Sequence, residues 1–224
     1  GKVEKLVLVN CCDSMRRVYD VVKSTGKCKF LYMLDLPHND NECEKVKFAG
    51  AIRRLKEAYE EYSGKIFDKN VFLKSFVQPA AEKHPYIGVL GVRVSGVLEE
   101  MIRENIHMDV ENLTCTGGRK LSVITEELQA MDEEEMFLMY ADVLLGQMPC
   151  FRMNTSTRRN QLYLDPNLKG IIYHTIKFCD YYGFEYASIK KFIKVPLLKI
   201  ETDFTSQSAG QLLTRIQAFS ETME

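Results

Sequence analysis

The stretch Leu6–Arg17, LVLVNCCDSMRR, joins an apolar, strand-like run to a helical pattern through two adjacent cysteines and an aspartate. A second stretch, GIIYHTIKFCDYYGF at residues 170–184, repeats the arrangement, because an apolar run leads directly into Cys179 and Asp180. Ligands of α/β sheets bind at the carboxyl ends of the parallel strands. Both Cys-Asp pairs therefore mark candidate functional positions.

Six strand-like runs alternate with helical patterns along the chain. Most of the runs are near-continuously apolar, which is typical of strands buried on both faces of a parallel sheet. The alternation predicts an α/β fold with right-handed crossovers. Strands are expected at 3–10, 29–36, 86–94, 108–116, 170–178 and 195–203, and helices at 14–23, 41–62, 97–105, 132–147, 181–193 and 207–221.

The segment VQPAAEKHP, residues 77–85, has two prolines and no strong periodicity, which is typical of a linker. It predicts a first lobe at residues 1–80 and a second lobe, with a C-terminal helix, at residues 81–224. Each lobe is expected to be a small, Rossmann-like, doubly wound parallel sheet, and the two lobes are expected to enclose a cleft. If the lobes face each other, both Cys-Asp thiols can point into this cleft.

Composition excludes several classes of protein. The 224 residues are 46% apolar and carry a formal net charge of −1, from 30 basic and 31 acidic side chains. This balance predicts a globular chain without a surface for nucleic acid or anionic membranes. No apolar run approaches the ~18 residues of a membrane span, and no signal peptide is visible. The seven cysteines do not form a compact disulfide pattern, so they are expected to be reduced and the protein cytoplasmic.

The cysteines at the strand ends admit two interpretations. Cys12 and Cys179 each precede a helix, whose N-terminal amides and dipole favour a thiolate that could bind a metal or an iron–sulfur cluster. Each could equally be a small buried hydrophobic residue. Cys150, in QMPCFRM, is a third candidate ligand or a packed loop cysteine. Zinc is disfavoured, since the chain has no Cys-x-x-Cys and its histidines are isolated.

Two further segments are candidates for binding. In LTCTGGRK, residues 113–120, Gly117 and Gly118 allow a tight turn with exposed amides, and Arg119 adds positive charge, so an anion could bind there. The alternative is an ordinary turn between a strand and a helix.

The C-terminal segment has a polar part and an apolar part. Glu201 and Asp203, at the carboxyl end of the final strand, and Gln211 beyond it are expected to face the cleft, whereas the apolar stripe of the last helix is expected to pack on the protein body. Arg215 is expected to bind an acid of the cleft or a paired subunit. The alternative is a terminal helix that only closes the core.

Several motifs, in order, give the chain a specific resemblance. They are NCCDSMRRVYDV (10–21), MLDLPH (33–38), IGVLGVRVSGVLEEMI (87–102), NLTCTGGRK (112–120), FCDYYGFEYASIKKFIKVPLLKIETD (178–203) and GQLLTRIQAFSE (210–221). The chain resembles the 2-hydroxyglutaryl-CoA dehydratase D-component family, which also includes benzoyl-CoA reductase subunits and double-cubane cluster proteins.

The resemblance implies a chemistry. Family subunits have two α/β lobes with a cysteine-bound 4Fe–4S cluster between them, and two related subunits pair. An ATP-hydrolysing iron–sulfur activator supplies one electron, and a 2-hydroxyacyl-CoA loses water through a ketyl radical. By resemblance Cys12 and Cys179 are cluster ligands, Cys150 aligns less firmly as a third, and Gly117, Gly118, Arg119, Glu201 and Gln211 are candidates for contacting the acyl-CoA.

The chain also departs from the family pattern. The family has a further ligand cysteine upstream of the first strand, and this chain begins at that strand, so its first lobe is expected to be truncated relative to the family. The helical stretch between the lobes is short as well. Two other functions therefore stay open: a related reductase of an aromatic acyl-CoA or small molecule, and a scaffold subunit without a complete cluster.

Overall fold

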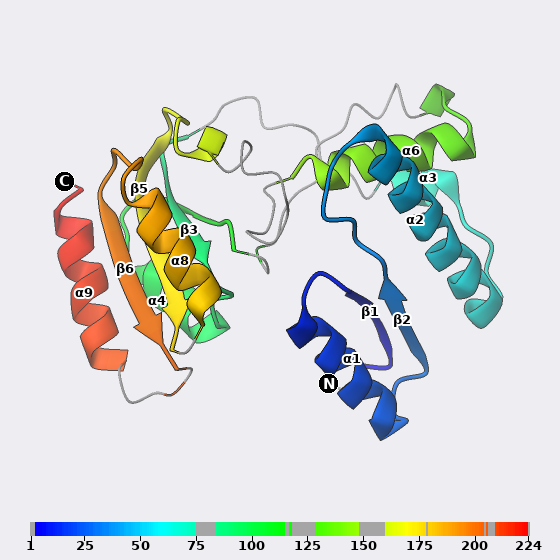
Figure 1. Ribbon diagram of the computed structural model, residues 1–224, viewed down its shortest axis with the longest axis horizontal. Helices are drawn as coiled ribbons and strands as arrows, with labels where there is room; N and C mark the ends of the chain where they lie inside the picture. The colour runs from blue at the N-terminus through cyan, green and yellow to red at the C-terminus, as the bar shows by residue number, and fades with distance from the viewer. Residues whose placement is uncertain are drawn as a thin grey trace. The chain divides into compact units, whose positions relative to one another are not determined.

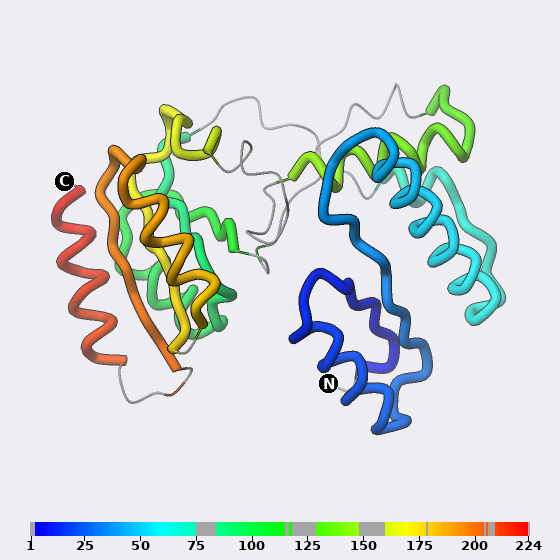
Figure 2. Tube along the Cα trace, viewed as in Figure 1, coloured from blue at the N-terminus to red at the C-terminus, as the bar shows by residue number. Residues whose placement is uncertain are grey.

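The computed structural model describes residues 3–74, 84–114, 117, 129–147, 160–177, 179–203, 205 and 209–223 (Figures 1 and 2). The chain divides into two compact units. Of the described residues, the first unit contains 3–74 and 129–147, and the second contains all the others. Each unit has a parallel sheet whose strands alternate with helices, which confirms the predicted α/β class.

The first unit contains the two-stranded sheet. Strand β1 (Lys5–Val9) pairs in parallel with β2 (Phe30–Leu34), and helix α1 (Asp13–Thr25) connects them. Gly26, with a φ of 61°, ends α1 in the left-handed conformation that favours glycine. Helices α2 (Glu42–Ser63) and α3 (Lys69–Leu73) follow.

Helix α6 (Glu133–Leu145) completes the core of the first unit. Its residues Met136 and Ala141 are fully buried, in a cluster that also contains Phe48 and Ile52 of α2. The lobe boundary expected near residue 80 places this helix in the second lobe. In the structure it packs in the first unit instead. The difference has a physical reason: an apolar helix can bury its face against any complementary surface, however far away in sequence.

The second unit contains a four-stranded parallel sheet in the order β4-β3-β5-β6. Its strands are β3 (Tyr86–Gly91), β4 (Asp109–Asn112), β5 (Leu168–Ile176) and β6 (Leu197–Thr202), and its helices are α4 (Gly96–Asn105), α8 (Asp180–Ile189) and α9 (Ala209–Glu221). Every residue of β3 is buried, as its continuous apolar run predicts.

Helices cover both faces of this sheet (Figure 1). On one face Ile102 of α4 and Ile216 of α9 pack with Val89 of β3. On the other face Tyr182 and Ile189 of α8 pack with buried β5 residues. The second unit is therefore a doubly wound, Rossmann-like sheet.

No helix in the described part of the chain combines the length and apolarity that crossing a membrane requires.

Candidate functional site

The carboxyl edge of the four-stranded sheet is organised by one buried histidine. His174 of β5 is fully buried, and its Nδ1 lies 3.1 Å from the carbonyl oxygen of Val92, just beyond β3. Its Nε2 lies 2.7 Å from the hydroxyl of Thr202, the last residue of β6. A carbonyl only accepts, so Nδ1 carries the proton and Nε2 accepts from the threonine hydroxyl. A neutral imidazole thus joins three strands at the edge where α/β sheets bind ligands.

Gly91 allows the end of β3 to approach the backbone of His174 closely. Its φ is 92°, and a Cβ atom at this position would lie 2.1 Å from the carbonyl oxygen of His174. Strand β3 therefore ends at Gly91, three residues before the end predicted from the apolar run. The amide of Val92 then donates to the same carbonyl oxygen at 2.9 Å, and Ser95 caps α4 by accepting from the amide of Leu98.

We expect His174 to make the stability of the second unit depend on pH. Burial lowers the pKa of His174 from its usual value near 6.5, so the unfolded chain binds this proton more readily than the folded one. The stabilisation is complete above pH 6.5 and is lost as the pH falls below it. The loss is about 1.4 kcal/mol per pH unit at most. Urea unfolding between pH 7.5 and pH 5 measures it.

The matched control is His107→Gln, which replaces an exposed histidine of the same unit. This variant should keep the slope of stability against pH, whereas His174→Gln should flatten it. An unchanged slope in His174→Gln would contradict the assignment.

The two predicted cluster cysteines occupy equivalent local positions. Cys12 is the N-cap residue of α1 and Cys179 is the N-cap residue of α8, and both have extended backbones. Neither side chain makes a capping hydrogen bond, so neither sulfur is used by its own helix. Asp13 and Asp180 follow in the first helical turns, where their carboxylates also favour the positive end of the helix dipole.

The environment of each thiol is only partly apolar. Cys179 is half-buried against the cluster that contains Tyr86 and Tyr182, and Cys12 is half-buried in the first unit. The two cysteines lie in different units. The approach of their thiols across a cleft therefore stays a prediction. No disulfide forms among the described cysteines.

The polar residues after β6 are mostly engaged with their own segment. Asp203 accepts from the hydroxyl and amide of Thr205 at 2.6 and 3.0 Å and from Lys177 Nζ at 3.1 Å. These contacts hold the pKa of Asp203 well below its usual range, and the hydrogen bond from the Thr205 hydroxyl has the largest effect. The carboxylate is therefore ionised, and it fixes the connection that leaves the sheet.

Glu201 and Gln211 keep their predicted role as candidates. Glu201 Oε2 lies 3.5 Å from the Thr175 hydroxyl and 3.7 Å from Lys199 Nζ, and Gln211 is exposed in the first turn of α9. Arg215 does not contact an acid in the described residues but donates to the carbonyl of Lys199 at 2.6 Å. It therefore ties α9 to the edge strand β6.

The glycine turn after β4 is described only in part. The amide of Gly117 donates to the carbonyl of Thr114 at 3.1 Å, and a Cβ atom at Gly117 would lie 1.8 Å from the Asn112 carbonyl oxygen. The amide of this glycine is thus engaged within the protein, and a side chain at its position would meet the backbone. Gly118 and Arg119 lie outside the described residues, as do Cys115 and Cys150, so their binding roles stay predictions.

Two residues at the strand ends were missed in the sequence. Asn10 follows β1, donates to the carboxylate of Asp35 at 2.6 Å and accepts from the amide of Leu36 at 2.8 Å. It joins the carboxyl ends of β1 and β2, as His174 joins those of the larger sheet. An asparagine at the end of LVLVN and a histidine inside an apolar strand were the available signals, because each breaks an otherwise apolar run.

Comparison with known proteins assigns the chain to a class of dehydratase subunits. A family model described as "2-hydroxyglutaryl-CoA dehydratase, D-component" matches residues 74–223, which is about two thirds of the chain. The chain belongs to this family, as its motifs indicated. The matched region contains the second unit and α6, whereas the motifs around Cys12 and residues 33–38 lie before it.

A curated relative is the "Putative dehydratase subunit YjiM" of Escherichia coli (strain K12). It is 26% identical over 151 residues, which cover 62% of this chain and 38% of the relative. The matching part therefore spans well under half of that protein.

Proposed function

We propose that this chain acts as part of a subunit of an iron–sulfur 2-hydroxyacyl-CoA dehydratase. The observation that carries the proposal is the family match over residues 74–223, which includes Cys179 at the N-cap of α8 and the carboxyl edge of the parallel sheet. The substrate would be a 2-hydroxyacyl-CoA, and the partners would be a related second subunit or another copy of this chain, together with an ATP-hydrolysing iron–sulfur activator. The compartment would be the cytoplasm.

The donor chemistry of the two cysteines fits a 4Fe–4S cluster. Thiolates are the ligands that iron–sulfur clusters use, and both sulfurs are left uncapped at positive helix ends. Among the described residues no three His, Cys, Asp or Glu side chains gather as a metal site. Cys12 and Cys179 would therefore hold the cluster jointly with a ligand such as Cys150.

The protein would bind and orient the substrate, and a bound cluster would supply the one-electron chemistry at the thioester. Glu201 and Gln211, at the carboxyl end of β6 and the start of α9, would lie on the substrate side. Gly117, Gly118 and Arg119 would contact an anionic part of the acyl-CoA. Arg119→Ala should then weaken binding of the CoA ester in the assembled enzyme.

Iron and sulfide analysis tests the proposal. The full chain is purified anaerobically with its partner subunit, as the wild type and as the Cys12→Ser and Cys179→Ser variants. Each serine variant is expected to lose most of the iron and the cluster's EPR signal after reduction, because a hydroxyl is a poor ligand for this cluster. Cys43→Ser, which replaces an exposed cysteine of α2, should retain both.

Each outcome separates the candidate functions. A wild type without iron would favour the scaffold subunit, and unchanged iron in both serine variants would contradict the ligand assignment. A cluster-bearing protein that reduces an aromatic acyl-CoA and does not dehydrate 2-hydroxyacyl-CoA esters would favour the reductase.

A further inference from the structure

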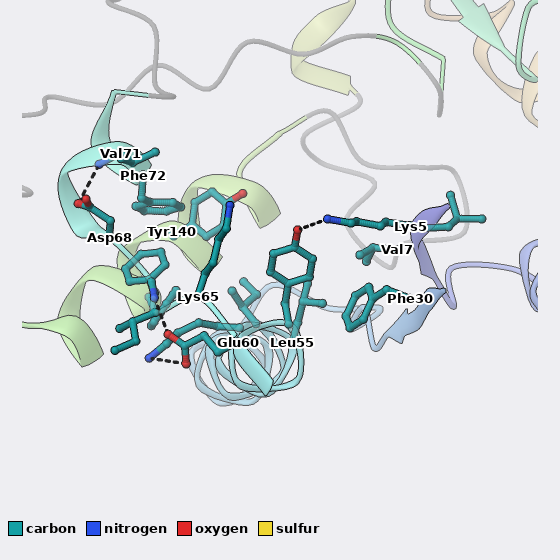
Figure 3. A pocket seen from close by; sticks show the side chains of 17 residues that line it. Lys5, Val7, Phe30, Leu55, Glu60, Lys65, Asp68, Val71, Phe72 and Tyr140 are labelled. Carbon is teal, nitrogen blue, oxygen red and sulfur yellow. Dashed lines mark hydrogen bonds and ion pairs between the residues drawn. The ribbon is translucent and has the colours of Figure 1, made fainter. Parts of the chain in front are cut away.

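The first unit contains a large apolar trough that the proposed cluster chemistry does not use. Its volume is about 690 Å³, within the range of pockets for small organic ligands. The trough lies between strands β1 and β2, the long helix α2, helix α3 with the connection that precedes it, and helix α6 (Figure 3). Its apolar lining comprises Leu6, Val7, Phe30, Ile52, Leu55, Ile66, Phe67, Val71, Phe72 and Phe137, together with the rings of Tyr59 and Tyr140.

The trough is built from two kinds of surface. Phe30, Ile52 and Phe137 are buried and form part of the packed core. By contrast Val7, Tyr59 and Val71 expose 43%, 38% and 64% of their surface, so the apolar lining continues from the core to the solvent. Exposed apolar side chains are concentrated here beside a hollow. Covering such a surface with an apolar ligand removes it from water and lowers the free energy.

The two acidic side chains of the trough are engaged with the protein. Glu60 accepts from the amide of Phe67 at 2.6 Å, and Asp68 accepts from the amides of Asn70 and Val71 at the start of α3. Asp68 thereby also occupies the amide donors at this helix end. Both carboxylates are therefore held in place by contacts within the protein, and Glu60 also lies 3.8 Å from the ammonium group of Lys56.

Two lysines of the trough have no carboxylate partner among the described residues. Lys5 Nζ donates a hydrogen bond to the Tyr59 hydroxyl at 3.0 Å, drawn as a dashed line in Figure 3. It also lies 5.4 Å from the centre of the Tyr59 ring. This hydrogen bond raises the pKa of Lys5, which keeps the ammonium charged. Lys65 lines the trough from the connection between α2 and α3 and makes no ion pair with the described residues.

Tyr59 adds a neutral donor to these charges. Its hydroxyl oxygen accepts from Lys5, and its own proton stays available to a second acceptor. The polar groups at the trough therefore offer positive charge and hydrogen-bond donors, while its walls are apolar and aromatic.

We propose that the trough binds a small amphipathic carboxylate, an organic acid with an apolar chain or ring and a single anionic head. The apolar body would lie along Leu55, Phe72 and Tyr140, and the head would be bound by the ammonium groups of Lys5 and Lys65 and the Tyr59 hydroxyl. Single ammonium groups on flexible stems suit a monoanion, whereas the described residues that line the trough include no arginine for bidentate binding of a phosphate. This site is independent of the cysteines and of the proposed dehydratase activity.

Calorimetric titration of the full chain with octanoate and with octan-1-ol tests the proposal. Octanoate is expected to bind saturably at one site per chain, and octan-1-ol about fivefold more weakly, because it lacks the charge that the exposed lysines attract. In the Lys5→Gln/Lys65→Gln variant the affinity for octanoate should fall to about that for octan-1-ol. The affinity for octan-1-ol itself should not change. Lys27→Gln, an exposed lysine outside the trough, serves as the charge control.

A second pair of variants tests the location. Val71→Trp, in α3, should fill part of the trough and abolish binding of both ligands. Val21→Trp, in α1, should leave binding intact, and the two valines are matched because each exposes 64% of its surface. Both positions are exposed, so neither substitution disturbs the core.

Several results would overturn the proposal. They are absence of saturable binding in the wild type, unchanged octanoate affinity in Val71→Trp, and equal affinity for octanoate and octan-1-ol. If the wild type is a dimer in sedimentation and Val71→Trp makes it a monomer, the trough is an interface between copies and the ligand proposal is wrong. Loss or retention of iron in the cysteine variants has no bearing on any of these results.

Discussion

Gly91→Ala is expected to destabilise the second unit by about 2–4 kcal/mol, through backbone strain and a steric clash. The φ of 92° lies in a region that residues with a Cβ atom rarely adopt, and the added Cβ would lie 2.1 Å from the His174 carbonyl oxygen. That contact is with backbone, which no side-chain rotation can relieve. Either β3 and β5 move apart or the turn into Val92 changes, and the His174 hydrogen bond to the Val92 carbonyl is then lost.

Urea unfolding followed by circular dichroism measures the loss, and hydrogen exchange of β3 and β5 amides locates it. The control is Gly183→Ala in α8, where a Cβ atom would meet nothing within 4 Å and the backbone is helical. That substitution should instead stabilise the unit, by about 0.5–1 kcal/mol. Equal effects at the two positions would contradict the strain argument.

Tyr173→Phe is expected to cost the second unit about 1–3 kcal/mol, the usual cost when a buried polar group loses a hydrogen-bond donor. Tyr173 of β5 is fully buried, and its hydroxyl donates to Oε2 of Glu185 on α8, which is 1% exposed. The substitution keeps the ring and its packing, so the measured loss reports on the donor. The carboxylate stays in its buried position with one donor fewer.

The matched control is Tyr186→Phe, on the same helix. The Tyr186 ring packs against Tyr173 with centroids 5.4 Å apart, but its hydroxyl makes no hydrogen bond with the described residues. Its removal should change the unfolding free energy by less than about 0.5 kcal/mol. In a Glu185→Gln background the cost of Tyr173→Phe should shrink, since a neutral amide is easier to bury than a carboxylate. An equal cost in both backgrounds would show that the Tyr173 hydroxyl does not act through the Glu185 charge.

The local features of the fold were predictable from the sequence. Continuous apolar runs predicted the parallel strands β3 and β5, because strands covered on both faces need apolar residues at successive positions. Asp132 and Glu135 form the capping box that begins α6, at the start of the helix predicted for residues 132–147. The placement of Cys12 and Cys179 between strand and helix was also predictable, since it follows from the order of neighbouring residues.

The site was predictable only in part. The cysteine positions could be read from the sequence because a strand end followed by a helix is a local pattern. The roles of His174, Asn10 and Arg215 could not, because their partners lie 16 to 82 residues away along the chain. Arg215 illustrates the difference, as its position suggested an acid or a subunit partner and the fold gives it the Lys199 carbonyl instead.

The sequence by itself determined the type and order of most strands and helices, and that the chain carries the motifs of its family, since these depend on residues close together in the chain. Only the tertiary structure decided which elements pack together. Helix α6 packs with α2 in the first unit although Ala51 and Ala141 are 90 positions apart, and the apolar trough beside α2 exists only because β1, α3 and α6 surround it. The physical reason is that burial of apolar surface has no direction along the chain: many pairings satisfy the same local pattern, and the free energy of the whole packed core selects one.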